Sequence, residues 1–564
     1  MITSNKKIVQ QIVLSCFLNG IKKVIVSPGS RNAPLSISFD ECDDFDCVVI
    51  HDERCAAFFG LGIAEQLNEP VALVCTSGSA LLNYYPAIAE AYYREIPLVV
   101  ISADRPPEWI NHGDGQTIVQ NNIYSNHILS QINLNDDDQS TSYISAAEKK
   151  IQELFNKCLS NRKGPAHINI GLNEPLYETS VISKYKSLKI ETSIEDQLLK
   201  NSDIKLLTQD LNASKILILV GQACFNNRTR ILLSDFAQNT NVAVLVENTS
   251  NLYNKDFVHC IDRTLTLIPS DKALPYAPDV LITIGGAVIS KKIKQFLRIN
   301  KAKKHYRISY AFPEMDTYRS LYKHFDCSVS SFFETLSTLP IERNTINYAS
   351  RWKQLDYKAK DRSENFYKEI VYSDLSVFNE ITKHLSENMF IHMANSSVVR
   401  YFQLFDPFED LNYFCNRGTS GIDGSTSTAL GAAFALPNKE HLLVSGDISF
   451  FYDSNALWNT YLGSNIKILL INNGGGGIFN IIPGASTSSQ REKYFEANYN
   501  LNAEYICKTY DIGYKRISEE DNLKESLNDF LNQKSHRPTL MEILTPRKIN
   551  ANILKEYFNY IQKD

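Results

Sequence analysis

The chain has 564 residues, of which 43% are apolar and 21% are charged, and its formal charge is −5. This ordinary globular composition excludes a disordered, collagen-like or coiled-coil protein, and the length predicts three or four domains. The slightly acidic balance gives no electrostatic reason to expect a nucleic acid or an anionic membrane as a partner. No apolar run approaches the ~20 residues that a membrane span requires. We therefore expect a cytoplasmic protein.

Two further sequence features favour that compartment. The early apolar stretch at residues 8–17 is interrupted by polar residues, and no small-residue cleavage site follows it, so a secretory signal is not expected. The 11 cysteines are scattered singly without any C-x-x-C pair, which argues against a disulfide framework and against a zinc site.

The first predicted element is a helix over residues 8–17, where apolar residues recur at helical spacing. Ser4 can cap its start and Asn19-Gly20 can end it in a left-handed turn. Further helical patterns cover residues 53–67 and 79–93. The predicted strands are residues 23–26, 71–76, 97–102, 216–220, 242–247, 280–284, 389–393, 442–445, 466–471 and 540–544.

This strand–helix alternation predicts parallel sheets with helices on their faces, and it restarts twice along the chain. The fold class is therefore α/β, with three tandem parallel-sheet domains at residues 1–180, 200–342 and 368–564. Polar, strand-poor stretches at about 179–203 and 342–367 are the predicted linkers.

The most informative motif lies in the third domain. A strand ends in Gly446-Asp447, a helix is expected at about 454–462, and the next strand ends in Asn472-Asn473 before four glycines, residues 474–477. Ligands of open α/β sheets bind at the carboxyl ends of the strands. Asp447, Asn473 and a backbone carbonyl such as that of Gly475 suit a magnesium ion that also binds phosphates. The glycines would let the backbone approach an anion and expose its amides.

The strand, Gly-Asp, helix, strand, Asn-Asn and polyglycine series resembles the diphosphate-binding motif of thiamine-diphosphate enzymes. The resemblance implies that Gly446, Asp447, Asn473 and Gly475 hold thiamine diphosphate through Mg²⁺ or Mn²⁺. It also requires a glutamate from another domain, and Glu53 in HDERCAAFF is the candidate. Such a carboxylate would hydrogen-bond to the aminopyrimidine ring and promote formation of the nucleophilic ylide. Taken alone, Glu53 could equally be a first-turn acid that stabilises its helix.

Further stretches resemble one family within these enzymes, the 2-succinyl-5-enolpyruvyl-6-hydroxy-3-cyclohexene-1-carboxylate synthases of menaquinone biosynthesis. They are dense in the first and third domains, whereas the middle domain contributes mainly IGGAVISKK at residues 284–292. The matching stretches are residues 25–35, 51–59, 75–91, 101–108, 164–177, 393–400, 415–433 and 445–483.

The resemblance implies a transferase that decarboxylates 2-oxoglutarate and adds the resulting succinyl carbanion conjugatively to isochorismate. Both substrates are dicarboxylates, and arginine binds carboxylates bidentately. The implied isochorismate-facing residues are Ser30, Arg31, Arg105, Gln116, Lys291 and Lys292. Ser396, Arg400 and Arg417 would meet the oxoacid carboxylates, Ile422 would bend the cofactor, and Phe479 would line the chamber.

Two positions depart from the family pattern, in which an Asn-Gln pair and a Lys-Arg pair are frequent. This chain has Gly115-Gln116 and Lys291-Lys292 instead. In the resembling family the cofactor lies between two subunits, which implies a homodimer at minimum and a homotetramer by further pairing. Two alternatives remain: another carboligase of the superfamily, such as an acetohydroxyacid synthase, and a scaffold protein that has lost its chemistry.

Overall fold

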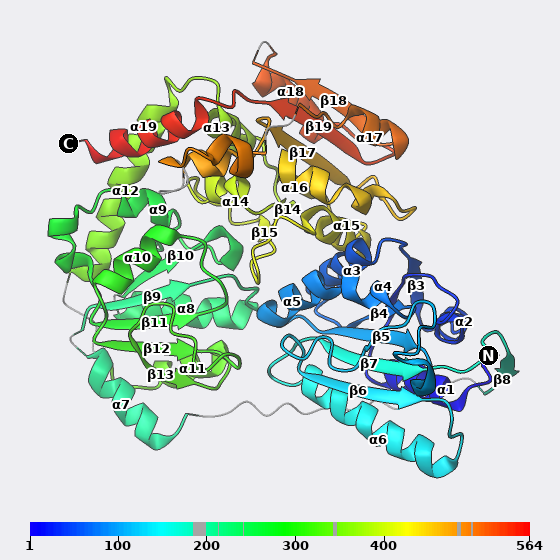
Figure 1. The fold of residues 1–564 in the computed structure, drawn as a ribbon. Helices are drawn as coiled ribbons and strands as arrows, with labels where there is room; N and C mark the ends of the chain where they lie inside the picture. Colours follow the sequence, from blue (N-terminus) through cyan, green and yellow to red (C-terminus); the bar gives the residue numbers. More distant parts are fainter. Residues whose placement is uncertain are drawn as a thin grey trace. The chain divides into compact units, whose positions relative to one another are not determined.

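The computed structural model describes residues 1–183, 199–212, 214–240, 242–341, 347–481, 487–497, 500–519 and 521–563. It contains three parallel sheets with helices between their strands, which confirms the predicted fold class (Figure 1). The chain forms two compact units. The first contains residues 1–194, 418–439 and 449–466, and the second contains residues 195–417, 440–448 and 467–564.

The first unit is built on a six-stranded sheet of order β3-β2-β4-β5-β7-β6. Its strands are β2 (Lys23–Val26), β3 (Asp46–Val49), β4 (Val71–Cys75), β5 (Leu98–Asp104), β6 (Ser130–Asn135) and β7 (Ala166–Gly171). Its amino-terminal helices are α1 (Lys7–Leu18), α2 (Ala33–Asp40), α3 (Glu53–Leu67), α4 (Ser79–Asn83), α5 (Tyr85–Arg94), η1 (Pro107–Trp109) and α6 (Thr141–Cys158). A short antiparallel pair joins β1 (Ile2–Ser4) to β8 (Thr179–Val181).

Later segments of the chain complete this unit. Helix α15 (Ser425–Ala435) packs against α3, and a Cβ at Gly62 would collide with the carbonyl oxygen of Thr428. The close approach of the two backbones therefore depends on a residue without a side chain. The buried carboxylate of Glu90 accepts hydrogen bonds from the backbone N–H groups of Gly418 (2.8 Å) and Thr419 (2.6 Å), which fastens the segment before α15.

The second unit contains a five-stranded sheet of order β10-β9-β11-β12-β13. Its strands are β9 (Ile216–Val220), β10 (Ala243–Val246), β11 (Val280–Ile284), β12 (Lys304–Ile308) and β13 (Leu321–Phe325). Its helices are α7 (Asn201–Leu211), α8 (Asn227–Thr240), η2 (Asn248–Ser250), α9 (Ile261–Leu265), η3 (Ser270–Lys272), η4 (Leu274–Tyr276), α10 (Lys291–Ile299), α11 (Val329–Ser337) and α12 (Tyr348–Tyr367). Strand β9 shows why such strands are continuously apolar: Ile216 and Ile218 join one hydrophobic cluster, whereas Leu217 joins another on the opposite face.

The carboxyl-terminal sheet has the order β15-β14-β16-β17-β19-β18. Its strands are β14 (Phe390–Met393), β15 (Asn412–Phe414), β16 (His441–Gly446), β17 (Ile466–Asn472), β18 (Gly513–Ile517) and β19 (Thr539–Leu544). The helices of this part of the chain are α13 (Asp374–Lys383), α14 (Ser397–Phe402), α16 (Asp447–Tyr452), which begins directly after β16, η6 (Gly477–Asn480), η8 (Arg491–Phe495), α17 (Glu504–Thr509), α18 (Leu523–Asn532) and α19 (Asn550–Gln562). The short helix η5 (Ser454–Leu457) belongs to the first unit, where it packs against α15 and α3.

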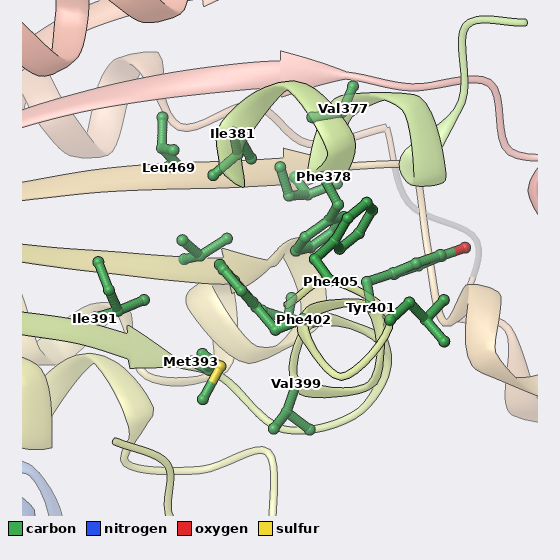
Figure 2. Packing of buried hydrophobic residues seen from close by; sticks show 14 of the residues in the cluster. Val377, Phe378, Ile381, Ile391, Met393, Val399, Tyr401, Phe402, Phe405 and Leu469 are labelled. Carbon is green, nitrogen blue, oxygen red and sulfur yellow. The ribbon is translucent and has the colours of Figure 1, made fainter. Parts of the chain in front are cut away.

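Aromatic packing holds α13 and α14 over this sheet (Figure 2). Phe378 of α13 stacks on Tyr401 of α14 with 4.9 Å between ring centroids, and Phe402 packs edge-on against the same phenylalanine. Each buried ring contributes roughly 1.5–3 kcal/mol by leaving water. The cluster therefore fixes the amino-terminal end of α13, where Asp374 lies.

Several local predictions are wrong. Ser4 ends β1 and does not cap α1, whose N-cap is Lys6. The predicted helix at 79–93 is divided at Tyr84, because α5 starts anew with a proline in its first turn. The helix expected at 454–462 begins instead at Asp447 as α16, followed by the short η5.

The two predicted linkers also differ from the structure. Residues 348–367 form α12, whose Trp352 is fully buried beneath an otherwise charged helix. Of the stretch at 179–203, β8 and the start of α7 are structured, and residues 184–198 lie outside the described part. No helix in the described residues is both long and apolar enough to cross a membrane.

Candidate functional site

The carboxyl ends of β16 and β17 bring together the acid and the loop that were predicted to hold a metal ion. Asp447 follows β16 directly, and Asn473 follows β17 directly. Asp447 Oδ2 accepts a hydrogen bond from the N–H of Gly475 at 2.8 Å. Gly446, the last residue of β16, and the glycine-rich loop thus lie at one edge of the sheet in the second unit.

Asn473 is held by one end of its amide only. Its Nδ2 donates to Asp374 Oδ2 at 3.0 Å, while its Oδ1 is buried and accepts no hydrogen bond from the described residues. A buried carbonyl oxygen without a partner costs about 1–3 kcal/mol. A magnesium ion would satisfy it, and Asp447, Asn473 and a backbone carbonyl are the oxygen ligands that this ion prefers. The residues present therefore fit a magnesium ion.

Burial raises the pKa of Asp447 to about 6, and the nearby Asp374 carboxylate adds to the rise. A divalent cation would stabilise the ionised form and reverse this tendency. Across the part of the chain that the structure describes, no group of three His, Cys, Asp or Glu side chains is placed to hold a metal ion. An oxygen site of one carboxylate, one amide and one backbone carbonyl needs no such group.

The glycine-rich loop differs from the prediction in how it uses its amides. All four glycine N–H groups donate inside the chain: Gly474 to Asn472 Oδ1, Gly475 to Asp447 Oδ2, Gly476 to Glu496 O and Gly477 to Gly475 O. The expectation that these amides are exposed to an anion is therefore wrong for this structure. Gly475, at φ +148°, instead permits a close approach, because a Cβ there would collide with Glu496 O.

In the first unit, Glu53 is the first residue of α3. Asp52 caps this helix by accepting from the N–H of Cys55 at 3.1 Å, which leaves the Glu53 side chain available for another role. Burial raises the pKa of Glu53, and a hydrogen bond with Asn83 opposes the rise. In the same unit, Ser449 Oγ donates to the carbonyl oxygen of Ile422 at 2.6 Å and so fixes the backbone that carries the predicted cofactor-bending residue.

The first unit also brings Arg31 and Arg105 within electrostatic range of each other. Burial lowers the pKa of Arg31 and the charge of Arg105 lowers it further. Each guanidinium has an acidic neighbour: Arg31 Nη2 lies 3.2 Å from Glu174 Oε1, and Arg105 Nε lies 3.3 Å from Asp114 Oδ2. Nearby positions were also predicted to face substrate. Ser30 is exposed before α2, and exposed Gln116 has a left-handed backbone at φ +54°.

In the second unit, Arg400 and Arg417 form a second cationic pair. Arg417 Nη1 donates to Asn395 Oδ1 at 2.8 Å, and Arg400 Nη1 donates to the carbonyl oxygen of Ser396. Burial lowers the pKa of Arg400, and the charge of Arg417 lowers it further. Ser396 has a left-handed backbone (φ +73°) directly before α14, which places its carbonyl beside the arginine.

The remaining predicted residues lie on α10 and η6. Lys291 is exposed at the start of α10, whereas Lys292 is half-buried, with Nζ 2.6 Å from Thr266 Oγ1 and 3.5 Å from the ring centroid of Phe558. Burial lowers the pKa of Lys292 to about 8. Phe479 of η6 is half-buried, and its ring centroid lies 5.7 Å from that of Phe495.

Two residues near the arginines were missed from the sequence. Lys294 of α10 lies in electrostatic range of Arg400 and Arg417, and burial lowers its pKa. Glu247 follows β10, is fully buried, and accepts from the N–H groups of Ile289 and Ser290 at the start of α10. Lys294 stands two residues after Lys292 in the sequence, which was a visible signal, but the partners of Glu247 lie more than 40 residues away.

Comparison with known families places thiamine pyrophosphate enzyme domains along most of the chain. "Thiamine pyrophosphate enzyme, N-terminal TPP binding domain" matches residues 6–125, "Middle domain of thiamine pyrophosphate" matches residues 188–392, and "Thiamine pyrophosphate enzyme, C-terminal TPP binding domain" matches residues 395–543. The residues of the candidate site fall inside these matches, with Glu53 in the first and Asp447 and Asn473 in the last.

Curated relatives extend the likeness over the full length. The chain is 44% identical over 561 residues to a 2-succinyl-5-enolpyruvyl-6-hydroxy-3-cyclohexene-1-carboxylate synthase of Flavobacterium psychrophilum, with 99% of each chain covered. It is 42% identical over 564 residues to the synthase of the same name from Flavobacterium johnsoniae, again with 99% of each chain covered, and 37% identical to that of Porphyromonas gingivalis, covering 99% of this chain and 98% of the relative. The chain therefore belongs to the family of 2-succinyl-5-enolpyruvyl-6-hydroxy-3-cyclohexene-1-carboxylate synthases, within the thiamine pyrophosphate enzymes.

Proposed function

We propose that the chain joins 2-oxoglutarate, with loss of carbon dioxide, to isochorismate in menaquinone biosynthesis, as a transferase dependent on thiamine diphosphate and Mg²⁺ or Mn²⁺. The observation that carries this proposal is the full-length likeness to synthases named for this product, at 42–44% identity for the two Flavobacterium relatives. Bound thiamine diphosphate supplies the nucleophilic carbon and the electron sink of the reaction.

The residues of the chain would then hold and orient the reactants. Asp447, Asn473 and the backbone of Gly475 would bind the metal ion, and Gly446 would let the diphosphate pass close to β16. Glu53 would hold a proton-sharing hydrogen bond to the pyrimidine ring of the cofactor. Support for this role comes from its raised pKa and from Asp52, which takes over the capping of α3. Ile422 and Phe479 would shape the reaction chamber.

Basic residues would bind the two dicarboxylates. We assign Ser30, Arg31, Arg105, Gln116, Lys291 and Lys292 to isochorismate, and Ser396, Arg400 and Arg417 to the oxoacid. Lys294 joins the second group, because its charge lies in range of both arginines. Like charges gathered in a partly buried place repel each other, and a bound dianion would remove this cost. Substrate binding would thereby orient the two reactants.

The working form in this proposal is a homodimer that pairs into a homotetramer, in the cytoplasm. Each subunit would have the three domains expected from its sequence: a pyrimidine-binding domain at 1–180, a central domain at 200–342 and a diphosphate-binding domain at 368–564. Support comes from the separate chain segments that carry Glu53 and Asn473 and from the absence of a membrane-spanning helix in the described residues.

The test is product formation by the purified chain. With thiamine diphosphate and Mg²⁺ present, we expect consumption of isochorismate only when 2-oxoglutarate is also supplied, and none after chelation of the metal. Turnover of pyruvate alone at a comparable rate would instead identify an acetohydroxyacid-type carboligase. A folded chain that binds the cofactor but turns over neither substrate would identify a scaffold.

A further inference from the structure

Asp374 has an unusual environment for a carboxylate. It lies in the first turn of α13 and is 3% exposed. Its Oδ2 accepts from Asn473 Nδ2 at 3.0 Å and its Oδ1 accepts from Thr545 Oγ1 at 2.5 Å. The two donors are neutral, so these contacts leave the negative charge without a compensating cation. Burying such a charge is costly unless something else stabilises it.

The contact with Asn473 sets the direction of that amide. A carboxylate only accepts hydrogen bonds, so the NH₂ end of Asn473 must face Asp374. The Oδ1 end is then turned away, and it is the buried oxygen that accepts nothing from the described residues. Without Asp374, the amide could rotate and present a donor where a metal ion needs an acceptor.

Asp374 also adds charge to the same place. Asp374 accepts from Asn473, and Asp447 accepts from the N–H of Gly475, two residues further along the same loop. The buried carboxylates of Asp374 and Asp447, together with the buried Asn473 Oδ1, create a negative potential that favours binding of a divalent cation over water. Loss of a residue that hydrogen-bonds to a metal ligand, without touching the ion itself, typically weakens metal affinity by about 10- to 100-fold.

We propose that Asp374 is a positioning residue of the metal site: it holds the Asn473 oxygen toward the ion and contributes a second negative charge without touching the ion. This inference rests on the proposed function, in which a divalent metal and thiamine diphosphate bind beside Asp447 and Asn473. Neither family likeness nor sequence pattern singles out this acid, because it lies 99 residues before Asn473.

The test is binding of Mn²⁺ to the full-length protein with saturating thiamine diphosphate, followed by the paramagnetic resonance signal of free Mn²⁺. Asp374→Asn should raise the Kd for Mn²⁺ by about 10- to 100-fold. The control Thr545→Val removes the other hydrogen bond to the same carboxylate but keeps its charge and its contact with Asn473, and we expect its Kd to stay within about threefold of the wild type.

Two further measurements distinguish a positioning role of Asp374 from a purely structural one. Melting curves show whether each variant is folded, and a double variant shows whether Asp374 acts through Asn473. If Asp374 acts through Asn473, the substitution should cost much less in an Asn473→Ala background. An unchanged Kd in folded Asp374→Asn, or an equal loss in both backgrounds, overturns the inference. Should Asp374→Asn not fold, Asp374→Ser is measured against the same criteria. Absence of cofactor-dependent Mn²⁺ binding by the wild type would overturn the proposed function as well.

Discussion

The ammonium group of Lys292 lies 3.5 Å from the ring centroid of Phe558, in a cation–π contact that joins α10 to α19. Two residues further along the helix, the side chain of Lys294 points about 200° away around the axis. It is therefore Lys294 that lies in range of Arg400 and Arg417.

This geometry predicts that Lys294→Met raises the KM for 2-oxoglutarate by about tenfold, equivalent to ~1.4 kcal/mol, because the substitution removes a cation from the group to which we assign the oxoacid. The matched control is Lys301→Met, an exposed cation just after the end of the same helix. Steady-state kinetics at saturating isochorismate measure both variants. Equal KM values for Lys294→Met and wild type would contradict the assignment.

Glu53→Gln should lower kcat by about 10²- to 10⁴-fold, the usual contribution of a positioned proton-transfer group. Glutamine preserves the size of the side chain but cannot share a proton with the cofactor ring. Asp52→Asn is the control, because asparagine also caps helices well and Asp52 is assigned no catalytic role. Cofactor binding by both variants is checked by circular dichroism, so that a loss of binding is not mistaken for a loss of chemistry.

The buried carboxyl group of Glu247 should make the stability of the protein depend on pH. Burial raises its pKa from the usual 4.5 to about 7, so between these values the folded chain binds a proton that the unfolded chain has released. The free energy of unfolding therefore falls as the pH rises from about 4.5 to 7, by up to ~3 kcal/mol, since one pKa unit is 1.36 kcal/mol. Asp262, Arg417, Lys294 and Tyr318 are the charged and titratable groups in its electrostatic range.

Glu247→Gln should flatten that dependence, because glutamine keeps an acceptor for Ser290 and does not titrate. Urea unfolding at pH 5 and pH 8 measures the difference. Glu334→Gln, in an exposed ion pair with Arg228, should leave the slope as it is. The same slope in wild type and Glu247→Gln would show that other groups cause it.

Arg263 predicts a large stability effect far from the glycine-rich loop. Its buried guanidinium contacts both oxygens of Asp406 at 3.1 Å and Asp356 at 3.3 Å. Arg263→Met would remove the buried cation that these carboxylates share, while Lys360 remains 3.3 Å from Asp406, and should cost about 3 kcal/mol. Lys353→Met, in an exposed pair with Asp256, should cost less than about 1 kcal/mol. Urea midpoints of the two variants give the comparison.

The sequence predicted the buried parallel strands well. The limits of β9 and β11 match the predicted ones residue for residue, because strands covered on both faces are almost continuously apolar; Thr283 is the one polar residue in these two strands. Helix α12 escaped detection because charged residues dominate it, and its buried side, with Trp352, is narrow.

The site was predictable only where its members are close in sequence or carry a family motif. Asp447 and the glycine loop could be found in this way. Asp374 and Glu247 could not, because their partners are set by the packing of α13 and α10 against distant segments. The exposure of the glycine amides was predicted wrongly for a related reason. The backbone carbonyl of Glu496, 20 residues further along the chain, accepts the hydrogen bond of the Gly476 N–H.

The pairing of α3 with α15 bears on how the protein is made. A ribosome delivers α3 more than 350 residues before α15. Domains begin to fold during synthesis. The surface of α3 around Gly62 therefore remains exposed to solvent, or bound by another protein such as a chaperone, until α15 has been synthesised. An amino-terminal fragment that stops near residue 180 would keep that surface bare, and expression trials with such a fragment should yield aggregates.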